Sequence, residues 1–232
     1  MVTSMLGACG SSNASSSSAS STATSSVSAS SASEEDTTAA SSSVSASSAS
    51  EEVSADADQE AADKVAALID AIYVQERNDN TDEQCKEAKE AWDALTDAQK
   101  ELVEGENADP DYFGRDTGDA SKDDPLNADE IGENEILVVS FGTSFNDSRA
   151  TDIGGIEKAI QAANPDWSVR RAFTAQIIIN HVQARDGEKI DNVDQALQRA
   201  VDNGVKNLVV QPTHLMHGAE SVSYTHLRAH ET

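Results

Sequence analysis

Basic residues are scarce in this sequence of 232 residues. Sixteen lysines and arginines stand against 42 aspartates and glutamates, so the formal net charge is −26 and the isoelectric point is near 4.2. A phosphate backbone would be repelled by that charge, and the sequence contains no basic stripe to bind one. The composition therefore argues against nucleic-acid binding, although acidity by itself names no other ligand.

Hydrophobic residues are also few, at 38%, and aromatic residues make up only 4%. A core for a chain of this length needs more apolar side chains, so part of the sequence is predicted to remain unfolded. No run approaches the roughly 18 consecutive apolar residues that a membrane-spanning helix requires. The folded portion is therefore predicted to be shorter than the chain and to contain no such helix.

Only two cysteines are present, Cys9 and Cys85, so no disulfide framework is predicted. Cys85 falls on an amphipathic stretch and is expected to be a small buried thiol. The stretch "MLGACG" around Cys9 resembles the cleavage and lipid-attachment site of a bacterial lipoprotein signal. The few residues before Leu6 leave no room for a basic and an apolar region, so residues 1–9 are interpreted as a truncated signal. Lipidation of Cys9 would tether the protein to the cell membrane, outside the cytoplasm.

Residues 10–55 consist almost entirely of serine, alanine, threonine and acidic residues. The stretch "SSVSASSASEE" occurs twice there, beginning at Ser25 and at Ser42. Such a segment cannot bury enough apolar surface to offset the entropy of ordering. It is predicted to be a disordered linker that lifts a folded domain away from a membrane surface.

Residues 57–104 carry apolar side chains at helical spacing, and a threonine precedes a glutamine by three residues at Thr81 and at Thr96, as in a capping box. We expect three short helices that form a small module, a spacer or an interaction unit, similar to the helical modules of Gram-positive surface proteins. Residues 105–134 are rich in aspartate, asparagine, glycine and proline. Because they lack the regular ligand alternation of a calcium loop, a solvated acidic linker is predicted.

A different pattern begins at Glu135 and runs to about residue 221. Apolar strands alternate with helices, which predicts an α/β fold with a doubly wound parallel sheet and helices on both sides. The strands are "ILVVS", "WSVRRAF" and "NLVVQP". The helices are expected to use an isoleucine stripe at Ile153, Ile156 and Ile160, a stop at Gly187, a cap at Asp191 and a stop at Gly204.

Ligands of such sheets bind where the strands end, and two segments qualify. "SFGTSFNDSR" follows the first strand, but it lacks the glycines of a dinucleotide turn and the lysine of a phosphate loop. "QPTHLMHGAE" follows the third strand and contains His214 and His217. The residues alone leave open whether these histidines are metal ligands, a base for proton transfer or structural polar residues.

Four segments, "VVSFGTS", "RRAFTAQIIINHVQARDG", "IDNVDQAL" and "LVVQPTHLMHGAE", resemble the amino-terminal half of the anaerobic sirohydrochlorin cobaltochelatases. That family is a branch of the class II chelatases and is related in fold to ferrochelatase. The resemblance runs in order from about Glu135 to Glu220. It implies an enzyme that inserts Co²⁺ into sirohydrochlorin during cobalamin biosynthesis, in a cleft between two similar α/β halves.

The resemblance also implies roles for particular residues. His214 corresponds to the metal-binding histidine and is our candidate for catalysis, because imidazole can bind Co²⁺ or accept a proton that leaves a pyrrole. Glu220 would offer an acceptor at the cleft rim, the role of His217 is left open, and His181 is expected at the surface. The substrate-side loop is implied to comprise Ser140, Phe141, Gly142, Thr143 and Ser144, with Phe141 offering a flat apolar contact.

The second half of the family's domain, which would supply further metal ligands, is not recognised in this sequence. Residues 222–232, "VSYTHLRAHET", resemble a translated sequencing adapter and are interpreted as a non-native tail. His226 and His230 therefore receive no role. An unpaired edge strand would make such a half domain poorly stable. Three readings stay open: a lipid-tethered cobaltochelatase fragment that is itself inactive, a surface-tethered binder of haem or another tetrapyrrole without chelatase activity, and a structural module. A homo-oligomer is compatible with each.

Overall fold

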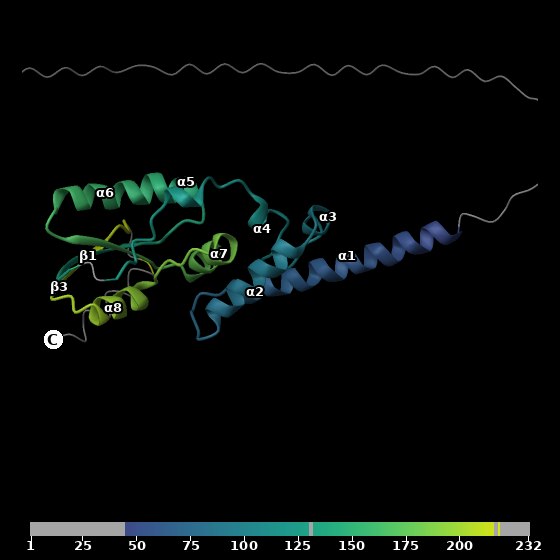
Figure 1. Ribbon diagram of the computed structural model, residues 1–232, viewed down its shortest axis with the longest axis horizontal. Helices are drawn as coiled ribbons and strands as arrows, with labels where there is room; N and C mark the ends of the chain where they lie inside the picture. Colours follow the sequence, from purple (N-terminus) through teal and green to yellow (C-terminus); the bar gives the residue numbers. More distant parts are fainter. Residues whose placement is uncertain (1–44, 130–131, 216–217, 219–232) are drawn as a thin grey trace, which may run out of the picture. The chain divides into compact units, whose positions relative to one another are not determined.

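The computed structural model describes residues 45–129, 132–215 and 218 (Figure 1). The predicted signal with Cys9, the residues His217 and Glu220, and the tail at 222–232 lie outside the described residues. Within the described part of the chain, no helix is long and apolar enough to cross a membrane.

The described residues form one sheet of three parallel strands in the order β2-β1-β3. Successive side chains of the central strand β1 point to opposite faces of the sheet, and the side chains on both faces are buried. Ile136 and Val138 pack in the cluster on the α6 side, whereas Leu137 and Val139 pack in the cluster on the α8 side. The predicted α/β fold is therefore confirmed. The strands are β1 (Asn134–Ser140), β2 (Ser168–Phe173) and β3 (Asn207–Pro212).

Helices cover both faces of this sheet (Figure 1). On one face α5, a π-helical turn and α6 follow one another without a break, and on the other face α8 packs against β1 and β2. Helix α7 follows β2 directly, and its Ile179 and Val182 pack on Phe173 at the end of that strand. The elements are α5 (Asn146–Ser148), the π-turn η2 (Arg149–Ile153), α6 (Gly154–Ala163), α7 (Gln176–Asp186) and α8 (Val193–Asp202).

Two predicted helix signals need correction. The cap of α8 is Asn192, not Asp191: Asn192 forms a capping box with Gln195, and Asp191 instead forms an ion pair with Arg199 at 2.7 Å. In the isoleucine stripe, Ile153 and Ile160 pack inward, whereas Ile156 is 47% exposed. The stop at Gly187 is confirmed by its left-handed φ of 74°.

The upstream helices pack around an apolar cluster that includes Val65, Ile69, Trp92 and Tyr112. The expectation of three short helices is wrong for the first of them, which is 28 residues long and begins inside the segment predicted to be disordered. The capping box at Thr96 is confirmed, but the cap of α2 is Asn80 and its side chain forms no cap hydrogen bond. These helices are α1 (Ser45–Ile72), α2 (Thr81–Ala94), α3 (Asp97–Lys100) and α4 (Asp111–Gly114).

The module contacts helix α7 of the α/β domain. Asn180 donates from Nδ2 to the carbonyl oxygen of Ile72 over 2.8 Å, and Cys85 donates from Sγ to the carbonyl oxygen of Asn180 over 3.7 Å. Cys85 is a free, fully buried thiol, as predicted, and burial raises its pKa to about 11. The helical module therefore packs directly on the element that follows β2.

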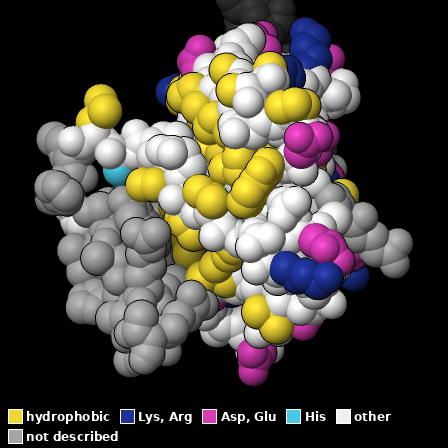
Figure 2. All heavy atoms as spheres, turned by 90° about the vertical axis from the view of Figure 1, so that its left-hand side faces the viewer, with side chains coloured by type: hydrophobic (Ala, Val, Ile, Leu, Met, Phe, Trp, Pro, Cys, Tyr) yellow, Lys and Arg dark blue, Asp and Glu magenta, His cyan; other side chains and the backbone are white. Residues whose placement is uncertain are grey.

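Strand β3 lies at an edge of the described sheet and is mostly exposed, unlike β1 and β2. Its Leu208 is 38% exposed and its Val209 46%, and Val201 on the adjacent α8 is 72% exposed. Figure 2 shows hydrophobic side chains gathered in a band along the face of the molecule that it presents. The apolar surface of this domain is thus covered less completely at β3 than at β2.

Candidate functional site

The candidate site lies where β1 and β3 end, which is the point at which the strand order reverses in a sheet of order β2-β1-β3. The residue after β3, Thr213, donates from its backbone N to the carbonyl oxygen of Val139 over 2.9 Å. Its Oγ1 also bonds to Oγ of Ser140 over 3.0 Å. The start of the predicted substrate loop and the segment that carries His214 are therefore tied together. We call this end of the sheet, residues 140–146, 174 and 213–214, the crest.

His214 is half-buried at the crest. Its Nε2 lies 3.3 Å from Oγ1 of Thr174, the residue that follows β2. The backbone N of Thr174 in turn donates to the carbonyl oxygen of Ser140 over 2.9 Å. The imidazole is therefore not fully buried in the sheet, and it is linked through Thr174 to Ser140, the last residue of β1.

The loop after β1 turns sharply at Gly142, whose φ is +101°. A Cβ there would lie 2.5 Å from Cδ2 of Phe173, so glycine is required both by the backbone conformation and by the close packing. Phe141 is 47% exposed and Phe145 is 45% exposed. Two aromatic rings thus flank the turn. Phe145 was not among the predicted site residues, although an aromatic three residues after the glycine of a strand-end loop is a readable signal.

A cavity of about 460 Å³ adjoins the crest on the β2 side. Phe173, Thr174 and Gln176 line it from the α/β domain, and residues 75–77 line it from the connection between α1 and α2. Arg77 in that connection pairs with Asp82 at 2.6 Å. Burial works to raise the pKa of Asp82, but hydrogen bonds from Arg77, Gln183 and Lys189 outweigh it and lower that pKa to about 2. The helical module therefore contributes one wall next to the crest.

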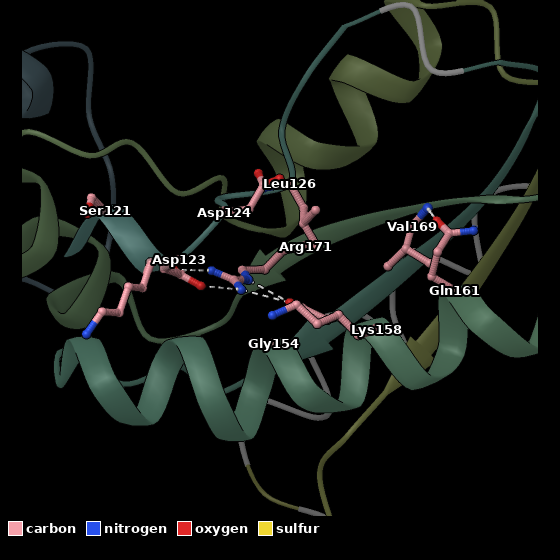
Figure 3. Close-up of a pocket in the computed structure, with 11 residues that line it drawn as sticks. Ser121, Asp123, Asp124, Leu126, Gly154, Lys158, Gln161, Val169 and Arg171 are labelled. Atoms are coloured by element: carbon pink, nitrogen blue, oxygen red, sulfur yellow. Dashed lines mark hydrogen bonds and ion pairs between the residues drawn. The ribbon is translucent and has the colours of Figure 1, made fainter. Parts of the chain in front are cut away.

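A second cavity, of about 410 Å³, lies under α6 (Figure 3). In its lining, Arg171 donates to Asp123 at 2.6 and 2.9 Å and to Glu157 at 2.8 and 2.7 Å. All three side chains are at most 2% exposed. Because four of the five N–H groups of this guanidinium are bound to buried carboxylates, we assign the cluster a structural role.

The two carboxylates of this cluster shift in opposite directions. Burial raises the pKa of Glu157, with Arg171 opposing that rise. Burial also works to raise the pKa of Asp123, but the hydrogen bonds and charges of Arg171 and Arg149 outweigh it and hold that pKa below its usual value. Asp123 comes from the stretch predicted to be a solvated acidic linker, so at this residue the prediction is wrong. The stretch also contains the short 3₁₀ helix η1 (Ala120–Lys122).

His181 also differs from the expectation of a surface residue. Its ring stacks on Tyr112 with the centroids 4.1 Å apart and an interplanar angle of 21°. Burial, with the positive charge of Arg185 as the second cause, lowers the pKa of His181 to about 4. The ring is thus a neutral packing residue between the helical module and α7, although it lines the same cavity of about 270 Å³ as Ser144 and Phe145 of the crest.

A metal site is not complete among the residues that the structure describes, which contain no group of three or more histidine, cysteine, aspartate or glutamate side chains suited to hold an ion. Of the predicted site residues, the structure links His214 to Ser140 through Thr174, and the turn at Gly142 follows Ser140. It does not describe Glu220, Cys9 or His217, so their roles stay predictions.

Comparison with known proteins agrees with the resemblance read from the sequence. Residues 134–228 match the sequence model of the cobalt chelatase (CbiK) family. The sirohydrochlorin cobaltochelatase of Salmonella typhimurium is 40% identical over 85 residues, which make up 37% of this chain and 32% of that protein. The chain thus spans about a third of the length of the relative it matches. The match begins at Asn134, the first residue of β1, so α1 to α4 lie outside it.

Proposed function

We propose that the crest is the tetrapyrrole-facing side of a cobaltochelatase site, at which Co²⁺ enters sirohydrochlorin during anaerobic cobalamin biosynthesis. The observation that supports the proposal is the link from His214 through Thr174 to Ser140, the residue that precedes the glycine turn at the strand-order reversal. The partial match to the cobalt chelatase family supports the same assignment.

The chemistry of metal insertion fits these residues. Two pyrrole N–H protons must leave while the ion sheds its water, so a borderline ligand and a base are needed close to the macrocycle. The imidazole of His214 serves either need, by holding Co²⁺ or by accepting a departing proton. Phe141 and Phe145, each nearly half exposed, offer flat apolar surfaces to the macrocycle.

Further ligands are required for a complete metal site. The described residues near His214 do not provide a set of three. We propose that Glu220 lies at the rim of the cleft as an acceptor, and that the remaining ligands come from residues beyond those described here. On this proposal the chain binds the tetrapyrrole but inserts cobalt slowly or not at all by itself.

The proposal is tested by titrating sirohydrochlorin into the purified chain and following the absorbance of the macrocycle. We expect saturable binding that weakens about tenfold or more in His214→Ala, the loss associated with one strong polar interaction. His181→Phe is the matched control, because it removes the other described imidazole, and we expect it to bind like the wild type. A wild-type chain that binds no sirohydrochlorin, or a His214→Ala variant that binds normally, contradicts the proposal.

A second candidate is a haem- or tetrapyrrole-binding protein without chelatase activity. One observation favours it: a single half-buried imidazole is enough for an axial haem ligand, whereas the described residues do not complete a site for Co²⁺. Adding haem instead of sirohydrochlorin separates the two candidates. A shift of the Soret band with tight binding of haem and none of sirohydrochlorin supports the second candidate, and the reverse supports the first.

We also propose that Cys9 carries a lipid that tethers the protein to the outer face of the cell membrane, because residues 6–9 have the pattern of a lipoprotein cleavage site. With a complete lipoprotein signal in place of residues 1–8, the protein should associate with the membrane, and Cys9→Ala should abolish that association. A Cys9→Ala protein that stays in the membrane fraction would contradict the tether without affecting the assignment of the crest.

A further inference from the structure

Two arginines, Arg149 and Arg185, donate hydrogen bonds to the turn that follows β1, residues 141–144. Nη2 of Arg185 donates to the carbonyl oxygen of Ser144 over 2.7 Å, and Nη1 of Arg149 donates to that of Thr143 over 3.4 Å. Both guanidinium groups also donate to Oδ1 of Asn146, Arg149 over 2.6 Å and Arg185 over 3.0 Å. Two successive peptide groups of the turn and the first residue of α5 thus share donors from these two side chains.

Carboxylates fix the guanidinium groups in turn. Arg149, whose side chain is fully buried, pairs with Asp123 at 2.6 Å and with Glu188 at 3.0 Å. Arg185 pairs with the adjacent Asp186 at 2.6 Å. A guanidinium is planar, so carboxylates that bind one edge also set the direction of the remaining N–H groups. The direction of the turn's carbonyls therefore depends on charges at the end of α7 and, through Asp123, in the upstream acidic segment.

The turn has few other restraints. Oγ1 of Thr143 accepts from the backbone N of Phe145 over 3.2 Å, and the backbone N of Ala175 donates to the carbonyl oxygen of Phe141 over 3.2 Å. The rings of Phe141 and Phe145 are nearly half exposed and add little packing. Glycine at position 142 leaves the backbone free to adopt other conformations. Among these ties of residues 141–144, the 2.7 Å bond from Arg185 to Ser144 is the shortest, and the 3.4 Å bond from Arg149 to Thr143 adds to it.

We propose that Arg185 and Arg149 are positioning residues, which hold the Phe141–Ser144 turn in the conformation that meets the macrocycle. The inference rests on the proposed function for its ligand, but the hold on the turn is measurable without a ligand. Neither side chain is assigned a contact with substrate. Both residues act through the carbonyl groups of Thr143 and Ser144.

The test compares Arg185→Gln, Arg185→Lys and a matched control, Arg115→Gln. Arg115 lines the same 270 Å³ cavity as Arg185 but pairs with Asp111 and is 58% exposed. Sirohydrochlorin affinity is measured by absorbance titration, and amide hydrogen exchange is measured for residues 141–146 and for β1. In Arg185→Gln we expect about tenfold weaker binding and about tenfold faster exchange in the turn, with β1 unchanged. Arg185→Lys keeps a charged donor and should recover part of the affinity and part of the protection from exchange. Arg115→Gln should change neither the affinity nor the exchange rate.

The outcomes separate this inference from the proposed function. Unchanged exchange in the turn of Arg185→Gln overturns the inference, and so does an equal acceleration in β1, which indicates general destabilisation. A wild-type chain that binds no sirohydrochlorin overturns the proposed function, while the exchange pattern still decides whether the arginine holds the turn. If Arg185→Gln does not fold, Asp186→Asn is used, because it removes only the carboxylate that pairs with Arg185. Amide exchange that is accelerated over the wild type in the turn but not in β1 supports the inference. Wild-type exchange in the turn overturns it.

Discussion

The polar groups under α6 and those at the crest of the same sheet differ in how far they are buried and hydrogen-bonded to one another. Under α6, Arg171 makes four hydrogen bonds to Asp123 and Glu157, and all three side chains are at most 2% exposed. At the crest, His214 is half-buried and Phe141 is 47% exposed. Because its charged groups are buried and bound mainly to one another, we assign the cluster under α6 a structural role. The crest instead keeps an imidazole and an aromatic ring that are partly exposed, so a ligand can reach them.

The largest effect is expected for Arg171→Met, which tests the structural side of the comparison. Removing the guanidinium leaves Asp123 and Glu157 buried beside each other, and loss of one partner from a buried ion cluster costs about 3–5 kcal/mol of unfolding free energy. Urea denaturation measures the change. The exposed Arg115→Gln should stay within about 0.5 kcal/mol of the wild type. A loss below about 1 kcal/mol in Arg171→Met would mean that the cluster does not hold α6 to the sheet.

Acid should lower the free energy of unfolding through His181, which packs between the helical module and α7. His181 has its pKa lowered from 6.5 to about 4 by burial, so below pH 6.5 the unfolded chain binds a proton that the folded chain does not. The contribution of His181 is thus present above pH 6.5 and is lost as pH falls toward 4, to a total of about 2–3 kcal/mol. We expect His181→Phe, which retains a ring against Tyr112, to remove this part of the pH dependence. Parallel stability curves for the two proteins between pH 7 and 4.5 would contradict the account.

A smaller loss of stability is expected for Gly142→Ala at the crest. The φ of +101° and the 2.5 Å approach of a Cβ to Phe173 predict a cost of about 1–3 kcal/mol. Gly155→Ala in α6 is the matched control, since a Cβ there meets nothing within 4 Å and alanine favours a helix. We expect this control to be neutral or slightly stabilising by thermal unfolding. Equal stability of the two variants would show that the turn is not constrained as described.

Much of the α/β domain could be predicted from the sequence because strand and helix periods are local. The apolar runs gave all three described strands, and glycine marked the stop at Gly187. The Asn192 cap was also readable, since Gln195 follows it by three residues, but Asp191 beside it is an equally good capping type. The contact between Asp123 and Arg171 was not readable, because 48 residues separate them and an acidic stretch looks solvated by composition.

The candidate site could be predicted only in part for the same reason. His214 and the turn at Gly142 follow strands, and strand ends of a parallel sheet converge. Arg149 and Arg185 lie on helices and reach the turn only through tertiary packing, so no local pattern indicates them. The partner of His181 is Tyr112, from the helical module, and burial by a separate segment cannot be read from the sequence around a histidine.

The central claim, that the imidazole of His214 faces a bound tetrapyrrole, is tested most directly by NMR of the chain with isotope-labelled histidine rings. The resonances of His214 are assigned by their loss in His214→Ala, and sirohydrochlorin is then added to saturation. We predict a large change in the ring resonances of His214 and little change in those of His181. Binding of sirohydrochlorin that leaves the His214 ring resonances unchanged would contradict it.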